Sequence, residues 1–378
     1  MRPGWVKKHL GEVCESKLGK TLNASTDHGE IRPYLCAVNV KWDAFDLATI
    51  KKAPFDADEI KKYSVQKGDL LVCEGGETGR AAIWDKEEPI QYQNALHRIR
   101  FKEGTILPRF CLHYLRYLKL SGVLDKEYSH GATILHLVSK SLYSIPIEYP
   151  SLPEQQRIVD ILDREFAKID ALKANAEKSL QAAKDLFQAT LKKELEPKEG
   201  WVIKPFGEIC DIFDKRRKPI SKRDREPGPY PYYGASCIQD YVKDYLFDGR
   251  YLLIGEDGAK WGPGDDTAYI VEGKFWVNNH AHIVKARDGF LDDYLRYYIK
   301  QLDLNPLVAG AIIPKLTQEK LVALEIPVPS FELQQEIVSK LDNLNDRCNT
   351  LQENYQKTLT LCDDLKQSLL RKAFSGEL

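Results

Sequence analysis

Two Asn/His pairs have the residue types and spacing that could do chemistry: Asn94 with His97, and Asn279 with His282. Each pair follows a strand-like stretch. An Asn amide can form two hydrogen bonds with adenine, and a His can donate to a base or a phosphate, so the pairs suit the reading of a nucleic acid. Two other interpretations stay open: the side chains anchor a loop to the backbone, or they form a duplicated hydrolytic site, for which neither pair has a neighbouring nucleophile.

Further polar candidates lie in loops that differ between the two halves of the chain. Such divergence is what the reading of two different half-sites would require. In the first half they are Lys17, Lys20, Asn23, Arg80, Arg98, His130, Thr133 and His136. In the second half they are Lys215, Arg216, Arg217, Lys218, Tyr233, Lys260, Trp261, Asn278, His280 and Lys315.

The sequence has no recognisable catalytic motif. Gly19-Lys20-Thr21 matches the end of a phosphate-binding loop, but Cys14 stands where that loop needs its first glycine. There is no HExxH or GxSxG motif, and no Asn-Pro-Pro-aromatic or Asp-Pro-Pro-Tyr tetrapeptide for methylating a base amine. The eight cysteines lack metal-ligand spacing. We therefore expect reduced core thiols, no catalytic residues and no metal.

The charge distribution limits where a nucleic acid could bind. The net charge of −1 gives no overall basic surface. One local excess exists: residues 215–225 hold seven basic residues and one acidic residue. A run of this kind is as often a plain solvated loop, so it decides little alone. With no signal-peptide pattern and no stretch of 18 apolar residues, we expect a cytoplasmic protein.

The elements that must position these residues occur twice. Trp5-Val6 returns as Trp201-Val202, Tyr114-Leu-Arg-Tyr117 as Tyr294-Leu-Arg-Tyr297, and the strand-like 69–73 as 251–254. Helical and strand-like patterns alternate within each copy, which predicts two mixed α and β units of an α+β fold. Duplication implies a pseudo-two-fold axis, which suits a two-fold partner such as duplex DNA.

Each copy closes with a long helical stretch. Residues 154–196 and 332–375 contain no glycine or proline. Apolar or small residues recur at alternating steps of four and three, which predicts a coiled-coil seam. In the second stretch the seam positions are Ile337, Leu341, Leu344, Cys348, Leu351, Tyr355, Thr358, Cys362, Leu365 and Leu369. The first stretch has the same register 179 residues earlier. A compact unit between the two helices makes them antiparallel, because it cannot return the chain along about 65 Å.

The chain resembles a specificity subunit of a type I restriction-modification system. The resemblance rests on the two unit exits, PSLPEQQRIV at 150–159 and PSFELQQEIV at 329–338, and on the closing LLRKAFSGEL at 369–378. It implies target recognition domains at 1–150 and 198–329, and spacer helices at 151–197 and 330–378.

The resemblance also implies a non-catalytic reader of a split site in double-stranded DNA, with the helices as a ruler. Two methyltransferase subunits would supply S-adenosylmethionine, and restriction/translocase subunits would supply ATP and Mg chemistry, so that no cofactor binds this chain and no membrane is involved. Two alternatives remain: a coiled-coil adaptor with protein-binding ends, which would show no salt-dependent DNA affinity, and the specificity subunit of a related system with a fused catalytic partner.

Overall fold

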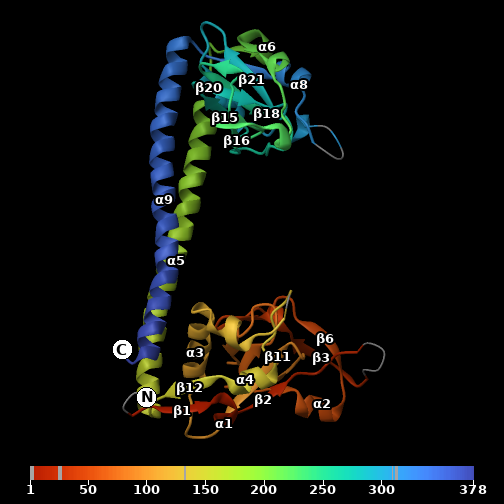
Figure 1. The fold of residues 1–378 in the computed structure, drawn as a ribbon, viewed down its shortest axis with the longest axis vertical. Helices are drawn as coiled ribbons and strands as arrows, with labels where there is room; N and C mark the ends of the chain where they lie inside the picture. Colours follow the sequence, from red (N-terminus) through yellow and green to blue (C-terminus); the bar gives the residue numbers. More distant parts are fainter. Residues whose placement is uncertain (1–3, 24–27, 132, 309, 311–313) are drawn as a thin grey trace. The chain divides into compact units, whose positions relative to one another are not determined.

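The computed structural model describes residues 4–23, 28–131, 133–308, 310 and 314–378 (Figure 1). The chain divides into two compact units. Unit 1 is Met1–Asn175 together with Thr358–Leu378, and unit 2 is Ala176–Lys357. Helix α5 (Leu152–Glu194) begins in unit 1 and ends in unit 2, whereas α9 (Phe331–Ser375) begins in unit 2 and ends in unit 1. The expected pair of long helices is confirmed.

Unit 1 contains two four-stranded sheets, with strand orders β2-β11-β8-β9 and β6-β3-β10-β7, and a short sheet β1-β12. Its strands are β1 (Val6–His9), β2 (Cys14–Leu18), β3 (Glu30–Leu35), β4 (Val40–Lys41), β5 (Ala44–Phe45), β6 (Lys51–Phe55), β7 (Ser64–Val65), β8 (Leu70–Cys73), β9 (Ala81–Ile83), β10 (Ile90–Tyr92), β11 (Leu96–Phe101) and β12 (Pro146–Tyr149). Its shorter helices are α1 (Leu10–Val13), α2 (Ala57–Lys62), α3 (Pro108–Leu120) and α4 (Ser139–Ser144), with a π-helical turn at Leu124–Tyr128.

Unit 2 repeats this plan, with sheets β14-β21-β18-β19, β16-β15-β20-β17 and β13-β22. Its strands are β13 (Val202–Pro205), β14 (Cys210–Ile212), β15 (Pro227–Tyr233), β16 (Ile238–Val242), β17 (Phe247–Asp248), β18 (Tyr251–Gly255), β19 (Ala268–Val271), β20 (Lys274–Val277), β21 (Ala281–Ala286) and β22 (Glu325–Val328). Its shorter helices are α6 (Phe206–Ile209), α7 (Asp292–Gln301) and α8 (Gln318–Val322). The strand orders match position by position, which confirms two mixed α and β units.

Strands β8 and β18 lie between two hydrophobic layers, because both of their faces are apolar. Leu70 and Val72 point into the core that contains the helices, whereas Leu71 and Cys73 point toward the second sheet. In β18, Leu252 and Leu253 divide in the same way. Strands covered on both faces read as continuous apolar runs, as 70–73 and 251–254 do. The turns that follow them are therefore held at a fixed place in each unit.

A buried glutamine fixes the start of each long helix. The side-chain oxygen of Gln155 accepts from the backbone N–H of Leu107, and its amide nitrogen donates to the carbonyls of Thr105 and Pro150, all at 2.9 Å. Gln334 makes the matching bonds to Leu291, Gly289 and Pro329 at 3.1–3.2 Å. The first glutamine of each exit motif thus joins the long helix to the loop that precedes α3 or α7.

Within unit 1 the two long helices run antiparallel. Lys173 Nζ lies 2.8 Å from Asp363 Oδ1, and Asp170, one turn earlier, pairs with Lys366, one turn later. In unit 2 the later part of α5 meets the first part of α9, where Lys340 Nζ lies 2.5 Å from Glu194 Oε1. Each unit therefore contains one antiparallel pair of helix segments.

The expected seam is correct only in part. Leu172, Leu186, Leu351 and Leu365 are 42–54% exposed, and the buried side chains near them are Phe166, Phe187 and Leu191 instead. Other predicted positions of α5, namely Leu162, Ile169, Ala176 and Ala183, are buried at a spacing of seven residues. In the part of the chain that the structure describes, no helix is long and apolar enough to cross a membrane.

Candidate nucleic-acid interface

Three segments meet in the same way in both units: the turn after β8 or β18, the start of β11 or β21, and a loop that contains a glycine. We call the described residues of 129–137 and of 308–316 glycine loops 1 and 2. The backbone N–H of Leu137 donates to Glu74 O at 2.6 Å, and His97 Nε2 lies 2.8 Å from Leu137 O. Unit 2 repeats both bonds. Leu316 N–H donates to Glu256 O at 2.8 Å, and His282 Nε2 lies 2.9 Å from Leu316 O.

Glycine is required in these loops by the backbone. Gly131 has φ +141° and Gly310 has φ +122°, a region that side chains with a Cβ rarely adopt. A Cβ on Gly131 would lie 1.9 Å from the carbonyl oxygen of Ile134. In loop 1 the backbones of His130 and His136 also bond to each other in both directions, at 2.9 and 2.8 Å. Loop 1 is therefore tightly turned, and both loops are anchored at their second arm through Leu137 and Leu316.

The two histidines of the Asn/His pairs anchor these loops. His97 and His282 are both fully buried. Burial lowers the pKa of His97, against the opposing effect of its bond to the Leu137 carbonyl, so the ring is neutral near pH 7 and Nε2 carries the donated proton. A base edge cannot reach either imidazole in this conformation. The structure thus favours the loop-anchoring interpretation for the histidines.

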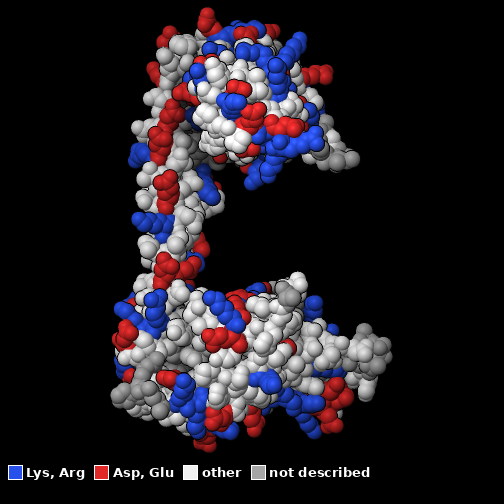
Figure 2. Space-filling model, viewed as in Figure 1, with Lys and Arg blue, Asp and Glu red and all other residues white. Residues whose placement is uncertain are grey.

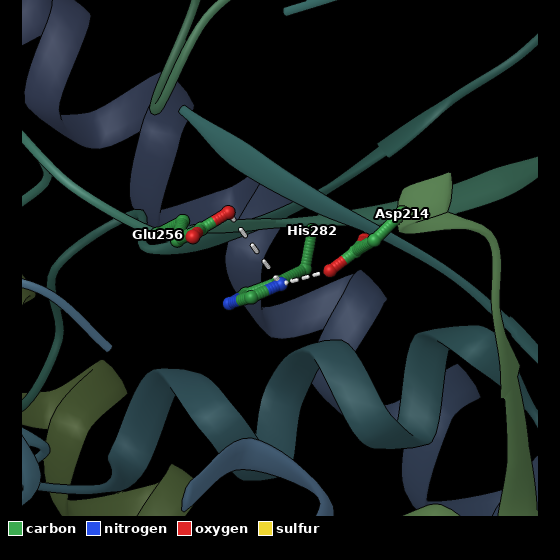
Figure 3. Close-up of side chains that lie close together, drawn as sticks. All are labelled: Asp214, Glu256 and His282. Atoms are coloured by element: carbon green, nitrogen blue, oxygen red, sulfur yellow. Dashed lines mark hydrogen bonds and ion pairs between the residues drawn. The ribbon is translucent and has the colours of Figure 1, made fainter. Parts of the chain in front are cut away.

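Unit 2 adds a buried ion-pair network around its histidine (Figure 3). His282 Nδ1 lies 2.6 Å from Asp214 Oδ2 and 3.9 Å from Glu256 Oε2. Arg217 bonds to Glu256 and lies 3.3 Å from Asp214, and Lys315 Nζ lies 2.6 Å from Glu256 Oε1. Burial raises the pKa of Glu256, but the bonds from Lys315 and Arg217 outweigh burial and leave that pKa below its usual range. Glycine loop 2 is thereby tied to the network through Lys315 and Leu316.

Asp214, Glu256 and His282 (Figure 3) each offer one atom that could bind a metal ion, and these atoms lie within 4.8 Å of one another. The geometry argues against a metal site. Both nitrogens of His282 are already engaged in hydrogen bonds, one with the Asp214 carboxylate and one with the Leu316 carbonyl. An ion would need about 2 Å to each ligand, and Nδ1 and the Asp214 oxygen are only 2.6 Å apart. The network is held by Arg217 and Lys315 instead.

The candidates of unit 1 divide into structural and exposed residues. Lys20 is buried, and its ammonium lies 2.7 Å from Glu59 and 2.9 Å from Pro54 O. Arg80 donates to the carbonyl of Ala37 at 2.8 Å. Asn94 and Arg98 are half-buried, whereas the exposed members are Lys17, Asn23, His130, Thr133 and His136. Three of the exposed candidates, His130, Thr133 and His136, therefore belong to glycine loop 1. Asn94 lies just before β11, the strand whose His97 anchors this loop.

The candidates of unit 2 divide in the same way. Trp261 packs in the core, Asn278 is buried and Tyr233 is half-buried. Lys260 and Asn279 are exposed, and His280, which bonds to Asp257, is partly so. The structure brings Arg217, His280, His282 and Lys315 together around Glu256 and its turn, and it leaves Tyr233 and Trp261 outside that group.

The basic run is partly structural. The guanidinium of Arg225 lies 4.3 Å from the ring centroid of Tyr232, and the half-buried Arg217 forms an ion pair with Glu256. The side chains that remain exposed are Lys215, Arg216, Lys218, Lys222 and Arg223. Figure 2 shows Lys and Arg side chains gathered on the visible face of the unit that carries β15 and β18. Only part of the run is therefore available to an anionic partner.

The glycine loops escaped the sequence analysis, although the sequence carries a signal for them. Gly131 precedes Leu137 by six residues, as Gly310 precedes Leu316, and both leucines lie thirteen residues before the proline of an exit motif. Aligning the halves at the exits, and not at their first residues, reveals this match. Comparison of the two halves does not point to Asp214, because the residue at the corresponding position of unit 1 is Leu18.

Comparison with known proteins adds a family to this geometry. The sequence pattern of the family described as type I restriction modification DNA specificity domain matches residues 3–182 and 198–361. A putative type I restriction enzyme specificity subunit of Haemophilus influenzae is 40% identical over 141 residues, 37% of this chain and 36% of that protein. The EcoprrI specificity subunit of Escherichia coli is 30% identical over 56% of this chain and 54% of its own length. The chain thus spans about a third to a half of these two relatives.

Longer but weaker matches cover nearly the whole chain. The EcoDI specificity subunit of Escherichia coli is 23% identical over 99% of this chain and 88% of its own. Among solved structures, a chain of a type I R-M system matches with a TM-score of 0.79 at 17% identity, over 100% of this chain and 99% of the other. The HsdS subunit of Thermoanaerobacter tengcongensis matches with a TM-score of 0.59 at 19% identity, over 100% and 98%. At these identities the structural matches establish the fold.

Proposed function

Because the chain belongs to the type I restriction-modification DNA specificity family, we propose that its two units each read one half of a split, asymmetric site in double-stranded DNA. The observation that carries this proposal is the anchored glycine loop, which both units build with the same hydrogen bonds. The side chains on that shared support differ: His136 in loop 1 corresponds to Lys315 in loop 2. One scaffold thus presents two different sets of groups, as two unlike half-sites require.

The proposed contacts are the accessible members of the candidate set. In unit 1 they are Lys17, Asn23, Asn94, Arg98, His130, Thr133 and His136. In unit 2 they are Lys215, Arg216, Lys218, Lys260, Asn279, His280 and Lys315. Positively charged side chains would hold the phosphate backbone, and Asn and His would contact base edges.

The proposed assembly divides the chemistry among subunits. This chain would bind DNA without catalysing a reaction and would dock two methyltransferase subunits, which bring S-adenosylmethionine, and restriction/translocase subunits, which use ATP and Mg. The fold match to a chain of a type I R-M system supports this division. Because the proposed target is the cell's own DNA, we place the complex in the cytoplasm.

Methylome sequencing of the source cell tests the proposal directly. With the gene intact we expect a split, adenine-methylated motif, and with the gene deleted that motif should lose its methylation. A methylome that is unchanged by the deletion would overturn the proposal. The purified chain should in addition bind duplex DNA with an affinity that falls steeply with salt, which a protein-binding adaptor would not show.

The long helices are proposed to set the distance between the half-sites. Removing seven residues from the middle of both α5 and α9 keeps their register and shortens each helix by about 10.5 Å. We expect the methylated motif to keep both half-sites and to lose base pairs between them. The ruler proposal fails if the spacing stays the same in a variant that still directs methylation.

A further inference from the structure

A cationic groove lies along the edge strand β2 of unit 1. Its lining residues are Glu15, Ser16, Lys17, Arg98, Arg100 and Tyr143, and its volume is about 390 Å³. In the antiparallel pairing of β2 with β11, Lys17 lies directly opposite Arg98, and Glu15 lies opposite Arg100. Opposed residues of a strand pair project to the same face, so two cations stand side by side there. Like charges in that position destabilise the sheet unless an anion lies between them.

Neither cation of the Lys17–Arg98 pair is neutralised. Among the described residues, Lys17 has no recorded hydrogen bond or ion pair, and its side chain is exposed. Arg98 donates one N–H to the carbonyl of Ser64, and its guanidinium carbon lies 5.7 Å from the ring centroid of Tyr92. These two contacts hold the guanidinium in place while four of its five N–H donors lack a recorded partner among the described residues. Arg100, by contrast, is bidentate to Asp69 at 2.6 and 2.7 Å.

The edge of β2 offers further polar groups at the groove. The hydroxyl of Tyr143 accepts from the Ser16 N–H and donates to the Ser16 carbonyl, both at 2.9 Å, which closes the strand edge to pairing. A rigid guanidinium and an ammonium on a flexible stem together suit a tetrahedral oxyanion.

Unit 2 has no counterpart of this cation pair. Asp211 opposes Lys285 there, as Glu15 opposes Arg100, but the next step along the pair brings Phe213 to Ile283. Two apolar side chains thus occupy the positions of Lys17 and Arg98. The difference lies within two sheets whose strand orders match, so it belongs to what distinguishes the two units.

From this geometry we infer that the groove of unit 1 binds a phosphate group of the DNA backbone, through Lys17 and Arg98, next to the half-site that unit 1 reads. This inference rests on the proposed function, since the phosphate is that of the bound duplex. It makes the backbone contacts of the two half-sites unequal, because the positions that match Lys17 and Arg98 in unit 2 are the apolar Phe213 and Ile283.

The salt dependence of duplex binding by the full chain tests the groove. Each neutralised phosphate contributes about 0.9 to the slope of log affinity against log salt concentration. Lys17→Ala should lower that slope by about 0.9, whereas Lys8→Ala, which removes an exposed lysine of the same unit outside the groove, should leave it unchanged. If the unaltered chain binds with a steep slope and Lys17→Ala keeps that slope, the groove inference is wrong and the proposed function stands. If the unaltered chain shows no salt-dependent binding, the proposed function itself fails.

Duplexes with a single methylphosphonate, which removes one backbone charge, identify the source of the phosphate. Scanned along the methylated motif, one position on the side of the unit 1 half-site should weaken binding of the unaltered chain and have no effect on Lys17→Ala. If Lys17→Ala lowers the slope but remains as sensitive as the unaltered chain at every position, the groove binds free phosphate and not the backbone, and the inference is overturned. Thermal unfolding of both lysine variants verifies that neither change acts through stability.

Discussion

The Nε2 atom of His97 lies 2.8 Å from the carbonyl oxygen of Leu137, which comes forty residues later in the chain. The same contact joins His282 to Leu316 in unit 2 at 2.9 Å. Each histidine thereby connects the central strand of a buried sheet to a loop at the surface. The position of the loop is thus set by the core, and the groups that the loop presents can differ between units without altering its support.

Replacing the two anchoring histidines should cost unequal amounts of stability. His97→Ala removes one buried hydrogen bond and leaves a carbonyl unsatisfied, which costs about 1–3 kcal/mol. His282→Ala also removes the partner of Asp214 in a buried ion-pair network, for which about 3–5 kcal/mol is usual. Urea unfolding of both variants measures the difference. Equal losses would show that the ion-pair network adds nothing to the anchor.

Each exit motif contains two adjacent glutamines, of which the first makes the hydrogen bonds at the start of the long helix and the second can serve as its control. Gln155→Ala and Gln334→Ala each delete three hydrogen bonds at a fully buried position and should lower the free energy of unfolding by about 2–3 kcal/mol. Gln156→Ala and Gln335→Ala alter exposed neighbours and should change it by less than about 0.5 kcal/mol. Thermal melting of the four variants, compared in pairs, decides whether the first glutamine carries the role of the motif.

The closing sequence of the chain should matter for unit 1. Phe374, at the end of α9, packs against Phe110 and Tyr114 with ring centroids 5.3 and 5.2 Å away. Phe374→Ala should cost about 3–5 kcal/mol, as truncation of a buried phenylalanine does. The control is Phe331→Ala at the opposite end of the same helix, where the ring is 38% exposed and the loss should be under about 1 kcal/mol. Similar losses at both ends would contradict the packing described for unit 1.

The carboxyl of Asp163 should make unit 1 sensitive to acid. Burial raises the pKa of Asp163, but hydrogen bonds from His113 and Arg109 outweigh burial and lower that pKa to about 2. A carboxyl with a depressed pKa in the folded state stabilises the fold above its ordinary value near 3.8 and ceases to do so as the pH falls toward 2. With one third of the side chain exposed, the effect is roughly 1–2 kcal/mol.

Urea unfolding at a series of pH values checks this effect. Asp163→Asn should be less stable than the unaltered chain at pH 7, and the two curves should converge between pH 4 and 2. Asp160→Asn, an exposed change on the preceding turn of α5, should run parallel to the unaltered chain throughout. A constant gap between Asp163→Asn and the unaltered chain down to pH 2 would refute the assignment.

Adjacent residues of the basic run should behave differently. Arg217→Ala breaks bonds to Glu256 and to the Ala281 carbonyl, so it should lower the thermal stability of unit 2. Lys215→Ala and Lys218→Ala remove exposed side chains, so they should leave stability unchanged and weaken DNA binding about equally for all sequences. Calorimetry and binding at fixed salt separate the two effects. Loss of stability in the lysine variants would place them in the fold and not at the interface.

The sequence was sufficient for the repeating parts of the fold. Apolar runs at 70–73 and 251–254 and the long stretches without glycine or proline predict strands and helices from local properties alone, and those elements are present. The seam prediction failed at Leu172 and Leu365, which are exposed, although the neighbouring seam positions Ile169 and Cys362 are buried.

The candidate site was less predictable, because burial depends on partners that are distant in the sequence. Arg216 and Arg217 are neighbours in one basic run, yet Arg217 is drawn inward by Glu256, 39 residues later. Likewise, an Asn/His pattern suits base reading and loop anchoring equally, and the carbonyl that decides between them for His97 belongs to Leu137. The spacing of residue types in the sequence does not predict the contact between His97 and the Leu137 carbonyl.

The division of the chain between the two units has a consequence for the order in which they can be completed during synthesis. Unit 2 is one continuous segment, 176–357, so its residues leave the ribosome in one uninterrupted series. Unit 1 begins to emerge first but needs residues 358–378, which are made after unit 2 is finished. Until then Phe110 and Tyr114 lack the ring of Phe374 that covers them. The later half can therefore mature first, and a stop codon shortly after codon 357 would leave unit 2 whole and unit 1 with an open core.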